Sequence, residues 1–170
     1  MNKKNIVLIG MPGAGKSTLG VLLAKVLGMS FVDTDLILQE KEQRLLQEIL
    51  DQDGVEGFLK IEEEVLLGLQ VRNCVIATGG SAVYSQAAMQ SLQNNGIVVY
   101  IKVSLSELEK RLQNMASRGV VMANGESLKD LYDKRTKLYE HYADCSVDCT
   151  NLTVEKAVTR IIASLYNVDK

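Results

Sequence analysis

Residues 10–17 are Gly-Met-Pro-Gly-Ala-Gly-Lys-Ser and match the pattern G-x-x-x-x-G-K-[ST] at every fixed position. Glycines let a backbone wrap closely round a polyphosphate with its N–H groups pointing inward. The lysine can reach the β- and γ-phosphates of a nucleotide, and the serine hydroxyl can ligate Mg²⁺. We expect the Lys16 side chain to face solvent. The segment predicts a binding loop for ATP and Mg²⁺, with nucleotide contacts from Gly13, Ala14, Gly15, Lys16, Ser17 and Thr18.

Short apolar runs alternate with longer amphipathic stretches on both sides of this loop. Residues 6–9 predict a buried strand that leads into the loop, and residues 17–26 predict a helix that follows it. Continuous apolar strands separated by helices are typical of a parallel sheet covered on both faces. The pattern predicts an α/β fold with a five-stranded parallel sheet flanked by helices, whose other strands lie near residues 31–32, 75–77, 97–101 and 147.

The bulk composition excludes several classes of protein. Hydrophobic residues make up 46% and charged residues 24% of the 170 residues, which suits a single domain over residues 1–170. The net charge is −2 without a Lys/Arg cluster, which argues against a nucleic-acid partner. No apolar run approaches the roughly 18 residues of a membrane span, and the first one lacks a signal-peptide cleavage site. We therefore expect a cytoplasmic monomer whose partner is a small-molecule substrate, without a membrane partner.

Carboxylates and glycines follow two of the predicted strands. Asp33 and Asp35 come after the second strand and would share one side if that stretch were extended. One of them can hold Mg²⁺ through water, and the other can orient a substrate hydroxyl, because phosphoryl transfer needs mainly positioning and charge stabilisation. A helix N-cap is the alternative interpretation of the pair. Gly79 and Gly80 follow the third strand, where they would expose backbone N–H groups to an acceptor or form an ordinary turn.

Four motifs resemble those of the shikimate kinase family in order and in spacing, over nearly the whole chain. They are the phosphate loop, residues 31–35 (Phe-Val-Asp-Thr-Asp), residues 77–80 (Ala-Thr-Gly-Gly) and residues 135–139 (Arg-Thr-Lys-Leu-Tyr). The resemblance implies an ATP-dependent kinase of a small hydroxylated metabolite, with shikimate converted to shikimate 3-phosphate as the leading expectation. It also implies a P-loop kinase fold, with an acceptor-binding helical region at about residues 35–69 and a lid at about residues 116–126.

The same resemblance implies catalytic and metal-binding roles for individual residues. It assigns phosphoryl transfer to Lys16, Asp35 and the lid arginine Arg118, which in the family approaches the transferring phosphate. It assigns the metal to Ser17 and Asp33, so that Asp35 is left for the acceptor hydroxyl.

Further roles concern the two substrates. Arg135 resembles the arginine that pairs with the acceptor's carboxylate, and Arg111 resembles the one that packs on adenine. Phe58 and Glu62 match the aromatic and the acid of the family's Phe-Arg-x-x-Glu segment; core packing is an equal alternative for Phe58. The expected acceptor site consists of Asp35, Gly79, Gly80 and Arg135.

Four positions depart from the family's pattern and leave the acceptor open. Leu59 replaces the arginine of Phe-Arg-x-x-Glu, which in the family joins the equivalent of Arg135 in binding the carboxylate. Ser81 replaces a third glycine, Gly119 a lid proline, and Val55 a glutamate. Another hydroxy acid, a polyol or an amino alcohol such as homoserine is therefore the alternative to shikimate. A nucleotide-binding module without an acceptor is a third candidate, against which the acceptor-side carboxylates argue.

Overall fold

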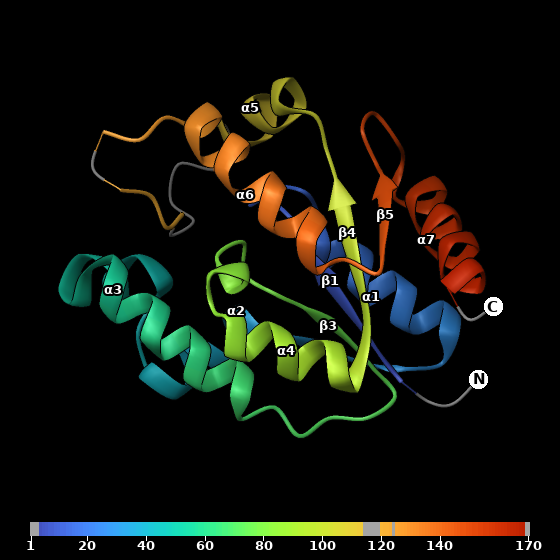
Figure 1. The fold of residues 1–170 in the computed structure, drawn as a ribbon, viewed down its shortest axis with the longest axis horizontal. Helices are drawn as coiled ribbons and strands as arrows, with labels where there is room; N and C mark the ends of the chain where they lie inside the picture. Colours follow the sequence, from blue (N-terminus) through green and yellow to red (C-terminus); the bar gives the residue numbers. More distant parts are fainter. Residues whose placement is uncertain (1–3, 114–119, 124, 169–170) are drawn as a thin grey trace.

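The computed structural model describes residues 4–113, 120–123 and 125–168. Its centre is a sheet in the order β2-β3-β1-β4-β5, in which every neighbouring pair of strands is parallel (Figure 1). The strands are β1 (Asn5–Ile9), β2 (Ser30–Asp33), β3 (Cys74–Ala77), β4 (Gly96–Lys102) and β5 (Cys145–Asp148). Helices flank this sheet, which confirms the predicted α/β fold with five parallel strands.

The central strand β1 carries the phosphate loop at its carboxyl end. All five of its residues are buried, as a strand covered on both faces requires. It pairs with β3 on one side, where Val7 lies opposite Ile76, and with β4 on the other, where Val7 lies opposite Val98. Because the strands are parallel, the carboxyl ends of β1, β2 and β3 meet at one edge of the sheet.

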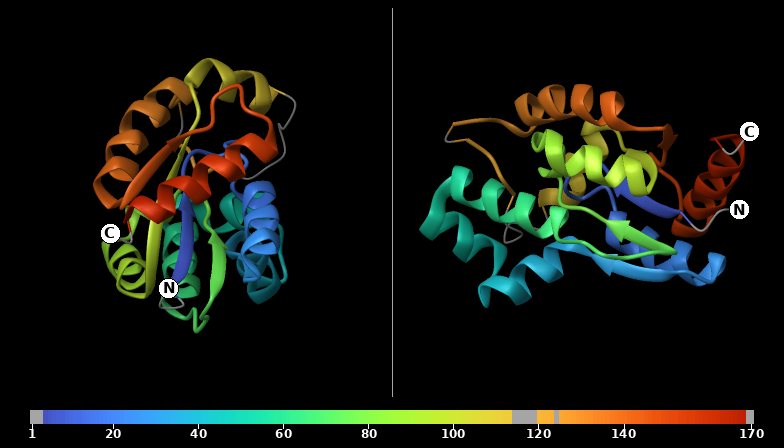
Figure 2. Two further views of the ribbon diagram at one scale, coloured as in Figure 1. Left: turned by 90° about the vertical axis from the view of Figure 1, so that its right-hand side faces the viewer. Right: turned by 60° about the horizontal axis from the view of Figure 1, so that its bottom comes forward.

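The helices cover both faces of the sheet. They are α1 (Lys16–Leu27), α2 (Thr34–Glu42), α3 (Leu46–Leu67), α4 (Gln86–Asn95), α5 (Leu105–Gln113), α6 (Leu128–Tyr142) and α7 (Val154–Val168), with a 3-10 turn η1 (Ala82–Tyr84). α1 and α4 lie on opposite faces, and α6 lies on the side of α4 (Figure 2). Within the described residues, none of these helices combines the length and the apolar composition that a membrane crossing requires.

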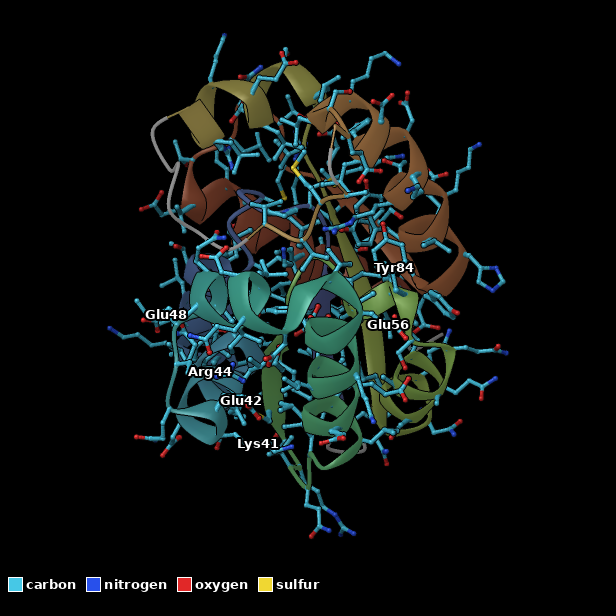
Figure 3. The ribbon with its side chains drawn as sticks, turned by 90° about the vertical axis from the view of Figure 1, so that its left-hand side faces the viewer. Lys41, Glu42, Arg44, Glu48, Glu56 and Tyr84 are labelled. Atoms are coloured by element: carbon cyan, nitrogen blue, oxygen red, sulfur yellow. The ribbon has the colours of Figure 1, made fainter. Side chains whose placement is uncertain are left out.

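The expected acceptor-binding helical region at about residues 35–69 consists of α2 and α3. α3 is kinked at Gly54, whose φ of 72° and ψ of −178° are not helical. α2 and α3 are separated at residues 43–45, which contain neither Gly nor Pro; Gln43 adopts a left-handed φ of 53° there. Arg44 secures this turn by ion pairs with Glu42 (2.8 Å) and Asp53 (2.7 Å); Figure 3 labels Arg44 and Glu42.

A second, small apolar cluster lies on the acceptor-side helices, apart from the core around the sheet. It consists of Leu38, Ile49, Phe58, Val65 and Val121. Val121 belongs to the expected lid segment and is buried, so this end of the segment packs against α2 and α3. Residues 116–119 and 124 of the expected lid, which include Arg118 and Gly119, lie outside the described residues.

Gly10, where β1 turns into the phosphate loop, provides a test of this architecture. Its φ is 149°, and a Cβ atom would lie 2.7 Å from the main-chain oxygen of Ile101 on β4. Gly28 has a φ of 65° but open space around it. Gly28→Ala should therefore cost only the left-handed strain of roughly 1–2 kcal/mol, whereas Gly10→Ala adds a clash with a strand that cannot move. We expect a clearly lower urea midpoint for Gly10→Ala; equal midpoints would contradict the close approach of the two strands.

Candidate active site at the carboxyl edge of the sheet

The phosphate loop joins β1 directly to α1. Gly15 is the N-cap of α1 and has a left-handed φ of 94°, a conformation that glycine adopts without strain. The loop closes on itself through a hydrogen bond from Ala14 N to Met11 O (3.1 Å). Because α1 begins at Lys16, its N-terminal N–H groups and the positive end of its dipole face the loop. This arrangement can bind an anion such as a phosphate group.

Lys16 does not face solvent, which corrects the expectation from the sequence. Its side chain is 7% exposed, and Nζ donates hydrogen bonds to Gly10 O (2.7 Å) and Met11 O (2.9 Å). The reason is geometric: a side chain in the first turn of a helix points back towards the N-terminus, here over the loop. Burial lowers the pKa of the ammonium to about 8, an effect that the negative charge of Asp35 opposes.

Asp33 and Asp35 are brought together by a helix cap and not by an extended stretch. β2 ends at Asp33 and α2 begins at Thr34, so Asp33 is the N-cap and its Oδ1 accepts a hydrogen bond from Asp35 N (3.0 Å). Its other oxygen, Oδ2, accepts from Ser17 Oγ (2.5 Å). The N-cap alternative is thus right for Asp33, and it leaves one oxygen of the carboxylate beside the phosphate loop.

Asp35 is a half-buried carboxylate on the first turn of α2. Burial raises its pKa to about 6, the negative charge of Asp33 adds to that effect, and the positive charge of Lys16 opposes it. A carboxylate with a raised pKa is a better proton acceptor than an ordinary aspartate. Its position opposite Lys16 therefore suits the orientation of a hydroxyl group.

Gly79 and Gly80 leave space for neighbouring charged groups because they have no side chains. Gly79 N donates to Thr34 Oγ1 (3.3 Å) in this structure, so it is not the exposed N–H group that the sequence led us to expect; the contact of Gly79 and Gly80 with an acceptor stays a prediction. A Cβ atom at Gly79 would lie 2.5 Å from Glu62 Oε1 and 2.8 Å from Asp35 Oδ1. A Cβ atom at Gly80 would lie 2.9 Å from Arg135 Nη1. The two glycines allow these charged groups to approach the strand end.

Glu62 has a buried carboxyl group that is hydrogen-bonded to Ser81, the residue at the place of the family's third glycine. Ser81 Oγ donates to Glu62 Oε2 (2.6 Å), while Oε1 has no hydrogen-bond partner in the described part of the chain. Burial raises the pKa of Glu62 to about 7, and the hydrogen bond from Ser81 opposes that shift. The match of Glu62 to a family motif pointed to this residue, but no sequence signal pointed to Ser81 as its partner.

Arg135 is 1% exposed and lies on the inner face of α6. Its Nε donates to the hydroxyl oxygen of Tyr84 (3.2 Å), and its Nη2 donates to Val121 O (2.6 Å). One turn later on the same face, Tyr139 donates to Gly80 O (2.6 Å). Tyr139 is the last residue of the motif at residues 135–139, whereas Tyr84 belongs to no motif and lies on no periodic element.

One cavity of about 570 Å³ brings most candidate residues together. Phe58 also lines it while being 2% exposed, so both interpretations of this aromatic hold. Ala14 and Arg111 do not line the cavity: Arg111 Nη1 donates to Gly13 O (3.1 Å) and Ala14 O (3.3 Å), and Nη2 pairs with Glu107. The candidate residues that line the cavity are Gly13, Gly15, Lys16, Ser17, Thr18, Asp33, Asp35, Gly79, Gly80 and Arg135.

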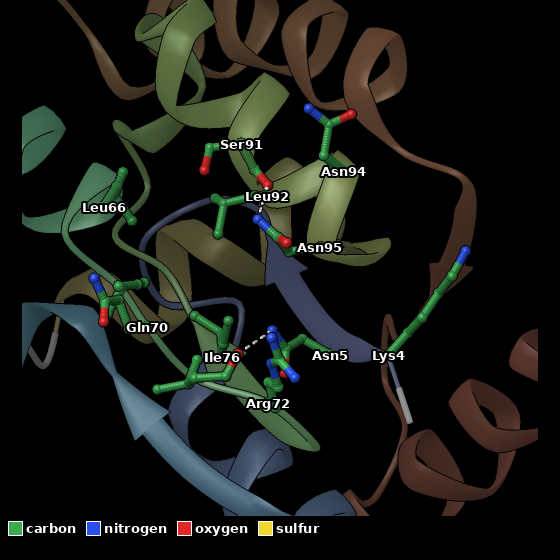
Figure 4. Close-up of a pocket in the computed structure, with 12 residues that line it drawn as sticks. Lys4, Asn5, Leu66, Gln70, Arg72, Ile76, Ser91, Leu92, Asn94 and Asn95 are labelled. Atoms are coloured by element: carbon green, nitrogen blue, oxygen red, sulfur yellow. Dashed lines mark hydrogen bonds between the residues drawn. The ribbon is translucent and has the colours of Figure 1, made fainter. Parts of the chain in front are cut away.

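A larger cavity of about 860 Å³ opens at the opposite, amino end of the sheet (Figure 4). Lys4, Arg72 and Asn95 are among its lining residues. Asn5 is buried there, and both polar atoms of its side-chain amide are engaged: Nδ2 donates to Val71 O (2.9 Å) and Oδ1 accepts from Cys74 N (3.1 Å). None of the candidate residues lines this cavity, so we place the chemistry in the smaller one.

Comparison with known proteins gives one consistent family. A family model described as shikimate kinase matches residues 12–166. The shikimate kinase of Legionella pneumophila (strain Corby) is 37% identical over 166 residues, which cover 96% of this chain and 95% of the relative. That of Actinobacillus pleuropneumoniae serotype 5b is 35% identical over 169 residues, which cover 98% of both chains.

Solved structures agree with the sequence relatives. A shikimate kinase from Acinetobacter baumannii in complex with shikimate is 29% identical, with a TM-score of 0.90 over 99% of this chain and 95% of that one. The enzyme from Aquifex aeolicus is 30% identical, with a TM-score of 0.79 over 96% of both chains. The chain therefore belongs to the shikimate kinase family, whose members are ATP-dependent phosphotransferases with an alcohol acceptor.

Proposed function

We propose that this chain transfers the γ-phosphoryl group of ATP to a hydroxyl group of shikimate, which gives shikimate 3-phosphate. The observation that carries the proposal is the 570 Å³ cavity, because the phosphate loop and the acceptor-side residues Asp35 and Arg135 line it together. Membership of the family and the likeness to a shikimate-bound relative support the same acceptor.

At the nucleotide end, Lys16 would bind the β- and γ-phosphates in exchange for the two carbonyl oxygens that it contacts in this structure. The N–H groups of the loop and of the first turn of α1 would surround the same phosphates. We assign adenine packing to Arg111, which lies beside the loop, and contact with the transferring phosphate to Arg118, which lies outside the described residues.

Ser17 and Asp33 fit a Mg²⁺ ion. Their side-chain oxygens are 2.5 Å apart and both residues line the cavity. Within the described residues, no group of three or more His, Cys, Asp or Glu side chains could hold a metal by itself. Mg²⁺ suits such a site, because it takes oxygen ligands and keeps several waters and phosphate oxygens. When bound, the ion would neutralise negative charge on the phosphoryl oxygens.

At the acceptor end, Asp35 would accept a hydrogen bond from the reacting hydroxyl and point its oxygen towards the γ-phosphate. Catalysis of phosphoryl transfer rests on this positioning, so one carboxylate with a raised pKa is sufficient. Arg135 would bind the carboxylate of the acceptor, because its buried guanidinium has neutral hydrogen-bond partners in the described residues and retains its charge for an anion.

We further propose that residues 1–170 act as one kinase domain, a monomer in the cytoplasm. Residues 35–69 would form the acceptor-binding region and residues 116–126 the lid. The small apolar cluster that joins α2, α3 and Val121 supports this division, because it connects both segments next to the cavity.

Leu59 favours a second candidate, a different acceptor for the same reaction. It does not line the main cavity but a separate one of about 180 Å³ beside it. A carboxylate in the main cavity would thus meet no cation from position 59. This observation favours an acceptor whose binding does not require two arginines around one carboxylate: another hydroxy acid, a polyol or an amino alcohol such as homoserine.

Release of ADP over a panel of hydroxy acids, polyols and amino alcohols distinguishes the two candidates. We expect shikimate to have the highest kcat/KM of the panel. A higher kcat/KM for any other compound of the panel would replace shikimate by the second candidate, and ADP release with no acceptor at all would reject the kinase assignment.

Replacement of Asp35 or Asp33 by asparagine should affect different kinetic parameters. Asp35→Asn should lower kcat by about 10²–10⁴-fold, the range for loss of a positioned base, while ATP affinity changes little. Asp33→Asn, the matched control, should instead raise the Mg²⁺ concentration needed for half-maximal rate. Titrations of Mg²⁺ and ATP on both variants check this, and an equal loss of ATP affinity in Asp35→Asn would move Asp35 to the metal.

The role assigned to Arg135 can be tested without changing the protein. Shikimate methyl ester keeps the ring and its hydroxyl groups but lacks the carboxylate charge. Loss of a hydrogen bond to a charged group costs about 1.5–3 kcal/mol, so the ester should have a KM about ten- to a hundredfold higher than the acid. Equal KM values for acid and ester would exclude a carboxylate-binding role for Arg135.

A further inference from the structure

Tyr84 lies beside the acceptor site although no motif includes it. It ends η1, the turn that follows Gly79, Gly80 and Ser81, and its backbone N–H donates to Ser81 O (3.0 Å). η1 contacts both α3 and α6, and Figure 3 shows Tyr84 where these elements come together. Its side chain is half-buried and lines the 180 Å³ cavity with Leu59.

Tyr84 contacts Arg135 in two ways. Its hydroxyl oxygen accepts a hydrogen bond from Arg135 Nε (3.2 Å), and the Arg135 guanidinium carbon lies 5.2 Å from the centre of the tyrosine ring. The second distance is within the range of a cation–π attraction. Both contacts come from a neutral group, so they fix the guanidinium without neutralising its charge.

The remaining contacts of Arg135 leave one of its nitrogens facing the strand end. Nη2 is taken by Val121 O (2.6 Å), and Nε is taken by Tyr84. Nη1 lies so close to Gly80 that a Cβ atom there would be 2.9 Å away. The Tyr139 hydroxyl, which also lies beside the guanidinium, donates its own hydrogen to Gly80 O (2.6 Å), and within the described residues Nη1 has no acceptor comparable to those of Nε and Nη2. Tyr84 and Val121 therefore hold the plane of the guanidinium so that Nη1 is left for an anion.

The two holding contacts come from different parts of the chain. Val121 belongs to the expected lid segment, whereas Tyr84 is attached through η1 to the end of β3, next to the acceptor site. A guanidinium that is held before the acceptor arrives loses less rotamer entropy on binding. Tyr84 can provide such holding from the turn that follows β3.

We propose that Tyr84 is a positioning residue for the acceptor: it holds the guanidinium of Arg135 in the orientation that binds a carboxylate. The proposal rests on the proposed function, since it requires Arg135 to bind the acceptor's carboxylate. It places a determinant of acceptor specificity on η1, outside the phosphate loop and the Asp33–Asp35 pair.

The test compares Tyr84→Phe, which removes the hydroxyl and keeps the ring, with Tyr84→Leu, which removes both. For shikimate, we expect KM to rise by roughly three- to tenfold in Tyr84→Phe and further in Tyr84→Leu. The kcat and the KM for ATP should stay at the wild-type values, because neither the base nor the phosphate loop changes. Tyr166→Phe on α7, where the tyrosine is 57% exposed, is the matched control and should leave every constant unchanged.

The methyl ester separates positioning of Arg135 from a general effect on the site. The rise in KM caused by Tyr84→Phe should appear with shikimate and vanish with its ester. A rise of equal size with both compounds, or no rise with shikimate, would overturn the proposal while the proposed function stands. If the wild-type enzyme itself does not distinguish acid from ester, the carboxylate role of Arg135 fails and the proposal about Tyr84 fails with it. Unfolding midpoints of the variants exclude a loss of folded protein as the cause.

Discussion

The buried ammonium group of Lys16 is the charge on which the arrangement of the site depends. Taking an ammonium group out of water is costly unless polar partners and opposite charges surround it. Two carbonyl oxygens of the loop supply the hydrogen bonds, and the carboxylates of Asp33, Asp35 and Glu62 act on it at longer range against the charge of Arg135. Each of these charged residues comes from a different helix or strand, so the parallel sheet has to assemble before the charges can balance.

The acceptor side has one candidate arginine for a carboxylate where the family pattern has two, because Leu59 replaces the other. Ser81, at the place of a family glycine, donates a hydrogen bond to Glu62, whose pKa is raised by burial. Arg135 is held by a phenol and a carbonyl group. With Leu59 on a separate cavity, selectivity for an anionic acceptor depends on how well one guanidinium is oriented. Orientation therefore has to replace part of the attraction that a second cation would add.

Apolar periodicity and one glycine-rich motif were sufficient to predict the sheet, its five parallel strands and the position of the phosphate loop. Side-chain direction was not predictable in the same way. The burial of Lys16 depends on α1 starting at that very residue, and the hydrogen bond of Gly79 N depends on a threonine from another element. Tyr84 meets Arg135 across 51 residues of sequence, and no local pattern connects the two. Sequence spacing identifies side chains that share a face of one helix or strand, whereas contacts between different elements can be identified only from the three-dimensional structure.

The separate apolar cluster on the acceptor side has a consequence for cooperativity. A protein with two cores has two units that can open with different free energies, and the unit with fewer buried side chains opens more readily. The small cluster contains five buried residues, against the continuous core that surrounds the sheet. Helices α2 and α3 with Val121 can thus loosen together while the sheet and the phosphate loop stay folded. By this argument the acceptor half opens at a lower cost in free energy than the nucleotide half, and exchange of a small acceptor requires only the acceptor half to open.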